Sequence, residues 1–94
     1  MLFDLIAVLR ARVLEDVGRD DEAAALYADL VERYPGDEVR CRYAGLLIKQ
    51  GRQDDARRLL GEVEHRLKRM SRQQRGADSA MYDWAMAELA KLRT

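Results

Sequence analysis

The sequence predicts an all-α protein. Apolar residues recur at three- and four-residue intervals in five segments, and no stretch alternates apolar and polar residues for long enough to indicate a strand. The chain has 94 residues, of which 48% are hydrophobic and 36% are charged, with a single proline. This length and composition are typical of one folded domain and argue against a disordered or low-complexity chain.

The first two predicted helices form a hairpin around Gly18. The first spans about residues 3–17 and stops at Gly18, because glycine readily takes the left-handed conformation that ends many helices. The second begins at Asp20 or Asp21, whose charges complement the positive end of the helix dipole, and Pro35–Gly36 ends it. The residues expected to face the core are Ile6, Leu9, Val13 and Val17 in the first helix, and Ala23, Leu26, Tyr27, Leu30 and Tyr34 in the second.

The next two predicted helices repeat this arrangement around Gly51. They span about residues 38–50 and 53–71, and the second carries Asp54 and Asp55 in its first turn. Adjacent acids at a helix start are explained by capping and the dipole, so they do not indicate a metal site. The residues expected to be buried are Cys41, Ala44, Leu47 and Ile48 in the shorter helix, and Ala56, Leu59, Leu60, Val63, Leu67 and Met70 in the longer one.

A fifth helix is predicted after a polar connection. Residues 72–77 contain Gly76 and form the linker, and the helix spans about residues 78–92, with Asp78 or Ser79 as its cap. One apolar face of this helix is expected to pack on the preceding helix: Met81, Trp84, Ala85 and Leu92. A second face is left over, and it indicates an interaction site unless another segment folds over it: Tyr82, Met86 and Leu89.

The chain also contains an internal repeat. Shifting it by 33 residues gives eight identities over the 23 positions from 11 to 33, including the pairs Gly18–Gly51 and Ala23–Ala56. These positions have physical roles, because the glycines end helices and the alanines let two helix backbones approach closely. The repeat therefore predicts two similar helical hairpins.

The segments GRDDEAAALYADLVERYPGD and GRQDDARRLLGEVEHRL resemble the second half of tetratricopeptide repeats, whose period is about 34 residues. Tyr27 matches the family's aromatic residue and Pro35 its terminal proline, whereas the second unit has Leu60 and no proline at these places. The small residues at the family's helix contacts are matched by Ala11, Ala23, Ala44, Gly45 and Ala56. The resemblance implies a right-handed α-solenoid of five antiparallel-packed helices, divided into repeat one (4–37), repeat two (38–71), a linker (72–77) and a C-terminal helix (78–92).

The resemblance also implies a function. It predicts a non-enzymatic protein–protein interaction module, whose concave groove is lined by the first helix of each pair and binds a partner protein or peptide. When the family's concave positions are carried over residue by residue, the expected groove is apolar with a basic centre. It lacks the lysine and asparagine pattern by which some members clamp a C-terminal carboxylate. Its expected residues are Leu5, Val8, Arg12, Val39, Arg42, Leu46, Lys49, Tyr82, Met86 and Leu89.

Charge is balanced over the whole chain and uneven along it. The net charge is zero, but residues 1–37 hold nine acids and four bases, whereas residues 38–76 hold five acids and eleven bases. An acid-free basic run lies at the end of the fourth helix and in the linker: Arg66, Lys68, Arg69, Arg72 and Arg75. Most of this run is explained as a solvated helix end, because the helix dipole favours cations at a C-terminus. An anionic partner is the alternative, either the acidic repeat of a second copy or, with less support because no aromatics interleave the run, nucleic acid.

The sequence predicts no catalytic site, cofactor or metal. His65 lies off the apolar stripe of its helix and is expected to be solvated, and Cys41 occupies a helix-contact position where a buried thiol is expected. Each glycine ends a helix or marks a turn, so no phosphate-binding loop is indicated.

Three further expectations concern assembly and compartment. The alternative function is self-association as a homodimer, or capping of a larger solenoid, through the surplus apolar faces of the first and fifth helices. Asp4, Arg10 and Arg12 interrupt the apolar start before it reaches the length of a membrane span, so we predict none in this chain. A single cysteine suits the cytoplasm. Similar repeats also form the C-terminal end of longer bacterial proteins, some of them membrane-anchored. It therefore stays an open alternative that this chain is part of such a protein.

Overall fold

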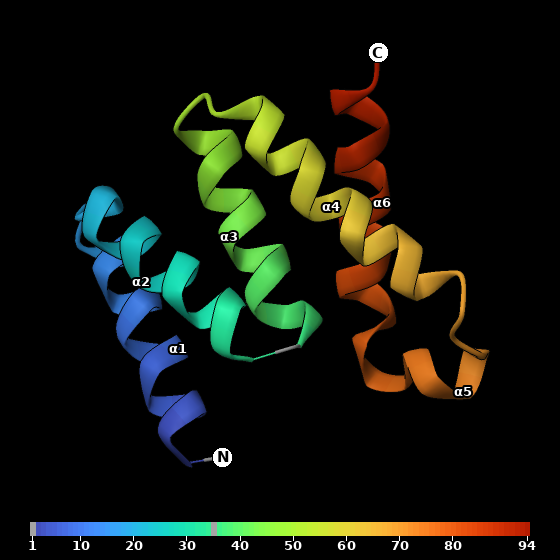
Figure 1. Cartoon of the computed structure of the whole chain (residues 1–94), viewed down its shortest axis with the longest axis horizontal. Helices are drawn as coiled ribbons and strands as arrows, with labels where there is room; N and C mark the ends of the chain where they lie inside the picture. Colours follow the sequence, from blue (N-terminus) through green and yellow to red (C-terminus); the bar gives the residue numbers. More distant parts are fainter. Residues whose placement is uncertain (1, 35) are drawn as a thin grey trace.

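The computed structural model (Figure 1) describes residues 2–34 and 36–94. Over these residues the chain is all α, with no strand. Five helices have 13 to 15 residues: α1 (Leu2–Asp16), α2 (Asp20–Arg33), α3 (Asp37–Lys49), α4 (Gln53–Leu67) and α6 (Ser79–Leu92). The short helix α5 (Arg72–Arg75) and the 3₁₀ turn η1 (Gly76–Asp78) connect α4 to α6. Consecutive long helices pack on one another, and α3 also contacts α6. The expected helix stop at Pro35 lies outside the described residues.

The two predicted glycine stops are confirmed and have the same local structure. Gly18 has φ +82° and Gly51 has φ +79°, the left-handed region that favours glycine. After α1, the Gly18 N–H donates to the Glu15 carbonyl at 3.0 Å and the Arg19 N–H to the Leu14 carbonyl at 2.8 Å. After α3, the same two bonds recur 33 residues later, from Gly51 to Ile48 and from Arg52 to Leu47. The internal repeat therefore corresponds to a repeated helix-ending motif.

The end of α4 differs from the prediction. The helix stops at Leu67 rather than at residue 71, and the expected linker contains the helical turns α5 and η1. The cause is a capping box: the Gln74 N–H donates to Ser71 Oγ at 3.2 Å, and the Ser71 N–H donates to Gln74 Oε1 at 2.8 Å. Because Ser71 starts a new helix, it cannot also continue α4. Asp78 is the residue before α6 but its side chain makes no capping hydrogen bond, because η1 runs directly into the helix.

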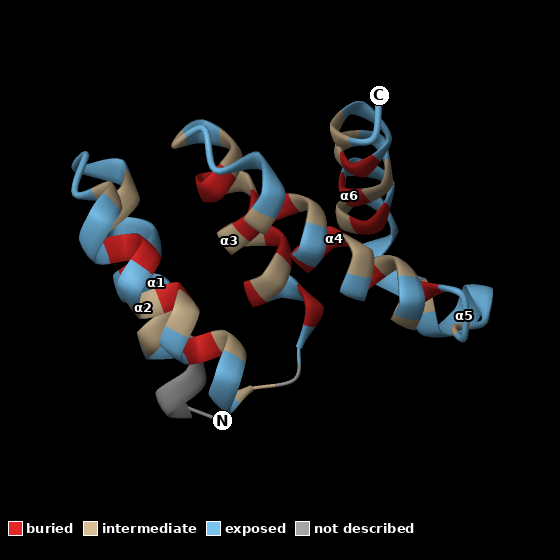
Figure 2. Ribbon diagram, turned by 45° about the horizontal axis from the view of Figure 1, so that its top comes forward, coloured by how far each residue is buried: buried red, intermediate tan, exposed pale blue. Residues whose placement is uncertain are grey.

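The core consists of two clusters that share residues. One joins α1, α2 and α3, and the other joins α3, α4 and α6. Figure 2 shows buried stretches on the ribbons of these helices. Val31 and Tyr43 touch both clusters, and the ring of Tyr43 stacks on that of Tyr27 with centroids 6.1 Å apart. Ala23 and Ala56, which are paired by the internal repeat, are both fully buried. The two hairpins therefore share a continuous core.

The predicted inner face of the first helix is wrong. The side chains that pack toward α2 include Ala7, Ala11 and Leu14. The four residues of the predicted face are exposed instead. Together with Leu5 they form what we call the α1 outer stripe, with exposed fractions between 45% and 63%: Leu5, Ile6, Leu9, Val13 and Val17. Apolar residues surround α1 on most sides, so periodicity alone does not select the packed side. The side with alanines allows the closer approach of α2.

The predicted division of the last helix is also wrong. Tyr82, Ala85 and Leu89 are buried at 6%, 0% and 1% exposure against α3 and α4, so Tyr82 and Leu89 are core residues rather than a surplus face. Trp84, expected in the core, is 38% exposed. The two candidate faces lie only about 100° apart on the helix. Because α6 contacts both α3 and α4, its buried face is the one that carries Tyr82 and Leu89.

Candidate functional site

The candidate site is a groove of about 490 Å³ between α1, α3 and α6. Its floor is α3, one wall is Glu15 of α1, and the other wall is the start of α6 with the end of η1. We call it the α1–α3–α6 groove, and its lining consists of Glu15, Glu38, Cys41, Arg42, Gly45, Leu46, Asp78, Met81 and Trp84.

Trp84 forms the apolar wall of this groove. A Cβ atom placed on Gly45 would lie 3.5 Å from Trp84 Cη2 and 3.6 Å from Cζ2, so the indole lies beside α3 where α3 has no side chain. Cys41 and Leu46, below it, are almost completely buried. The part of the indole that stays exposed therefore provides a flat apolar surface above a closed floor.

The groove is acidic. Its lining includes three carboxylates and one guanidinium, a formal charge of −2. The guanidinium is already paired, because Arg42 Nε donates to Glu38 Oε1 at 3.2 Å. Glu15 Oε2 accepts a hydrogen bond from the Tyr27 hydroxyl at 2.6 Å. Among the residues that the structure describes, Asp78 has no hydrogen bond or ion pair through its side chain. The groove therefore presents uncompensated negative charge.

The sequence predicted a different lining. Of the ten expected residues, Arg42 and Leu46 line this groove, and Arg42 is the one of the three expected cations found in its lining. Val39, Leu46, Tyr82 and Leu89 are buried, and Val8 and Met86 pack partly against the two clusters. Leu5 belongs to the α1 outer stripe, Arg12 is exposed on α1, and Lys49 Nζ pairs with Asp20 Oδ2 at 3.2 Å.

The groove residues on α6 differ from those that the sequence predicts. Met81 and Trp84 were assigned to the packed face, although they lie three residues apart and follow Asp78 at the same spacing. A single tryptophan flanked by acidic residues is a sequence signal that could have identified this wall. Helical periodicity could not, because it treats every apolar residue as a core candidate.

A buried polar cluster fixes α6 beside this groove. Asp37, 6% exposed at the start of α3, accepts a hydrogen bond at Oδ2 from the Tyr82 hydroxyl at 2.8 Å. Arg66 Nε of α4 lies 3.2 Å from Asp37 Oδ1. The three groups join α3, α4 and α6 at one end, and they hold the carboxylate charge in a paired state.

This cluster predicts a pH dependence of stability. Burial and the hydrogen bond to Asp37 raise the pKa of Tyr82 from 10.0 to about 12. Because the folded-state pKa is the higher one, the stabilisation is complete below pH 10 and is lost as the pH rises toward about 12. We expect the free energy of unfolding, measured by urea titration, to fall over this window, and to fall less in Tyr82→Phe. Identical pH profiles for the two proteins would contradict the buried cluster.

The predicted basic run does not form one free patch. Arg66 is paired with Asp37, and Arg75 is partly buried. Lys68, Arg69 and Arg72 are exposed after α4 and at the start of α5. None of the five lines the α1–α3–α6 groove. The run is therefore split between a structural ion pair and a solvated helix end.

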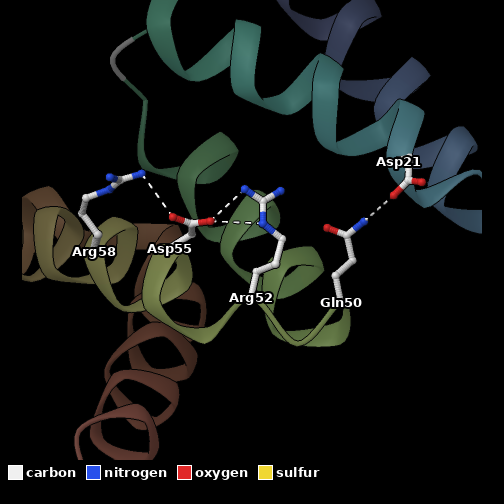
Figure 3. Close-up of polar contacts among 5 residues, drawn as sticks. All are labelled: Asp21, Gln50, Arg52, Asp55 and Arg58. Carbon is white, nitrogen blue, oxygen red and sulfur yellow. Dashed lines mark hydrogen bonds and ion pairs between the residues drawn. The ribbon is translucent and has the colours of Figure 1, made fainter.

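A second hollow lies on another side of the molecule, between α2, α3 and α4, and its charges are largely compensated (Figure 3). Asp55 pairs with Arg52 Nη2 at 2.8 Å and with Arg58 Nη2 at 3.5 Å. Gln50 Nε2 donates to Asp21 Oδ1 at 3.1 Å. Most charged groups of this hollow pair with one another, although Asp20 Oδ1 and Gln50 Oε1 are buried without a hydrogen-bond partner. Because the α1–α3–α6 groove also has a partly exposed tryptophan in its wall, we take that groove as the candidate site.

Two reactive side chains were singled out in the sequence, Cys41 and His65. Cys41 is 3% exposed, as predicted, and its burial, with the charge of Asp37, raises the pKa of the thiol to about 11. It is therefore protonated at neutral pH. His65 is exposed on α4. Within the described part of the chain, no three histidine, cysteine or acidic side chains are grouped so as to hold a metal ion.

Comparisons with known proteins returned no match: no family model, no curated protein and no solved structure is similar to this chain. Among the described residues, no helix has the length and apolar character needed to cross a membrane.

Proposed function

We propose that the protein is a non-enzymatic interaction module that binds a peptide segment of a partner protein in the α1–α3–α6 groove. The observation that carries this proposal is Trp84, a large aromatic side chain left 38% exposed in the wall of a groove with an apolar floor. Tryptophan side chains in such positions provide much of the energy at protein interfaces. The two hairpins with equivalent glycine stops further support a tetratricopeptide-like organisation, in which the first helix of each unit contributes to the binding face.

The test is a selection of displayed random peptides on the whole chain, followed by binding measurements on a groove variant. In Gly45→Leu the new side chain projects toward the indole of Trp84 and fills the groove. We expect enriched peptides to bind the wild type and to lose at least tenfold in affinity for Gly45→Leu. The matched control is Ala90→Leu, which places the same side chain at an exposed position of α6 outside the groove.

Two results would overturn the proposal. One is a selection that enriches no peptide. The other is a set of peptides that bind Gly45→Leu as tightly as the wild type, because these would occupy another surface. Circular dichroism of both variants shows whether the fold is intact, and Gly45→Ala, whose Cβ meets Trp84 at ordinary contact distance, serves as the milder substitution.

Self-association is a second candidate function, favoured by the α1 outer stripe. Five large apolar side chains along one helix form an exposed patch on the order of a few hundred Å². Arg12 and Asp16 are exposed along one edge of this stripe, four residues apart. An antiparallel pairing of two α1 helices about a twofold axis would bury the five apolar side chains against the same stripe of a second copy, so a second copy of the chain is the occupant that this candidate function implies.

Light scattering after size exclusion tests this second candidate. We expect the wild type to form a dimer as its concentration rises, and Val13→Glu to remain a monomer. Ala90→Glu, which places the same charge on the exposed side of α6, is the control and should dimerise like the wild type. A wild-type chain that stays monomeric at near-millimolar concentration would exclude this function.

A further inference from the structure

The charges of the α1–α3–α6 groove define the kind of side chain that its ligand must carry. This step rests on the proposed function and adds the ligand's chemistry. The lining contains Glu15, Glu38 and Asp78 against one cation, Arg42. This negative surface would repel an anionic or acidic ligand, whereas a cationic ligand would be complementary to it in charge.

The partners of these four residues show where a ligand cation would bind. Arg42 pairs with Glu38 at 3.2 Å, and its charge also acts on the Tyr27 hydroxyl that binds Glu15. The carboxylate of Glu15 is engaged by the Tyr27 hydroxyl. Asp78 is left: it is exposed and, within the described chain, its carboxylate has no ion-pair partner. The open carboxylate therefore lies at the α6 wall of the groove, the same wall that carries Trp84.

Trp84 supplies the second half of a cation site. The face of an indole attracts an ammonium or guanidinium group through the ring quadrupole, and tryptophan is the aromatic side chain that does so most strongly. A carboxylate and an exposed indole on one wall suit a planar guanidinium especially well, because it can stack on the ring and pair with the acid at once. The long stem of an arginine or lysine would cover the apolar parts of Met81 and Trp84.

We propose that the groove binds a peptide segment through an arginine or lysine side chain that stacks on Trp84 and pairs with Asp78. The partner class is thus a basic segment of another protein. Glu15 and Glu38 are already engaged within the groove, so Asp78 is the carboxylate that the ligand cation pairs with.

The experiment uses the peptides that the groove-dependent selection enriches. We expect arginine and lysine to be over-represented relative to the unselected library, and replacement of the key basic residue by glutamine to weaken binding at least tenfold. With the unaltered peptide, we expect Asp78→Asn to weaken binding about threefold to tenfold. Because the Asp78 side chain makes no capping bond, asparagine leaves the start of α6 unchanged. Asp83→Asn removes the same charge from an exposed position outside the groove and should bind within about twofold of the wild type.

The outcomes separate this inference from the proposed function. Groove-dependent peptides without an excess of basic residues, or with unchanged affinity for Asp78→Asn, would overturn the cation site and leave the peptide-binding function in place. Groove-dependent peptides enriched in acidic residues would also overturn it. A selection that yields no groove-dependent peptide would overturn both.

Discussion

Tyr82→Ala is expected to lower the free energy of unfolding by about 3–5 kcal/mol, among the largest effects of any single substitution in this chain. The ring is 6% exposed in the cluster that joins α3, α4 and α6, and its hydroxyl donates to the buried Asp37 carboxylate. Truncation therefore removes aromatic packing and leaves a buried acid with one partner fewer. Urea unfolding followed by circular dichroism measures the change.

Tyr82→Phe is the matched control, because it keeps the ring and removes only the hydroxyl. Its expected cost is about 1.5–3 kcal/mol, the value of one hydrogen bond to a charged group. If Tyr82 were an exposed groove residue, as the sequence predicted, both variants would unfold within about 0.5 kcal/mol of the wild type. That result would contradict the observed packing of α6, and Tyr82→Phe decides the question even if Tyr82→Ala does not fold.

Leu60→Ala is expected to cost about 3 kcal/mol, within the range for truncating a fully buried leucine. Leu60 has 0% exposure and lies on α4 in the cluster that α4 shares with α3 and α6. Truncating this side chain would leave a cavity in the core, because the neighbouring side chains are already closely packed and cannot fill the space. Thermal and urea unfolding of the purified variant measure the loss.

The matched control for this prediction is Leu9→Ala on the α1 outer stripe. Leu9 is 45% exposed, so we expect its truncation to cost less than about 1 kcal/mol at low protein concentration. An equal cost for both variants would mean that the outer stripe is covered in solution. A cost for Leu9→Ala that grows with protein concentration would place that cover in a second copy.

The sequence predicts the helices of this protein well, and local chemistry explains why. Gly18 and Gly51 can adopt positive φ at no steric cost, so they mark helix ends that the structure confirms. The early end of α4 could also be found in the sequence, because Ser71 and Gln74 have the spacing of a capping box. Helix boundaries are thus set by residues that are near one another in the chain.

The side on which each helix packs is less accessible to sequence reasoning. In α1 and α6, apolar residues occupy more than one face, so helical periodicity does not distinguish the faces. Packing against the other helices determines which face is buried. The groove depends on this selection, because Trp84 becomes its wall only when Tyr82 and Leu89 are in the core. Its negative charge likewise arises from residues of separate elements, which linear charge patterns do not bring together.

Quenching of Trp84 fluorescence tests the central claim, an open and acidic groove, most directly. Trp84 is the only tryptophan of the chain, so its emission reports on this wall alone. We predict ready quenching by neutral acrylamide. We also predict that the ratio of caesium to iodide quenching, at matched ionic strength, is higher for the protein than for free N-acetyltryptophanamide. Weak quenching by acrylamide, or a preference for iodide, would contradict this claim.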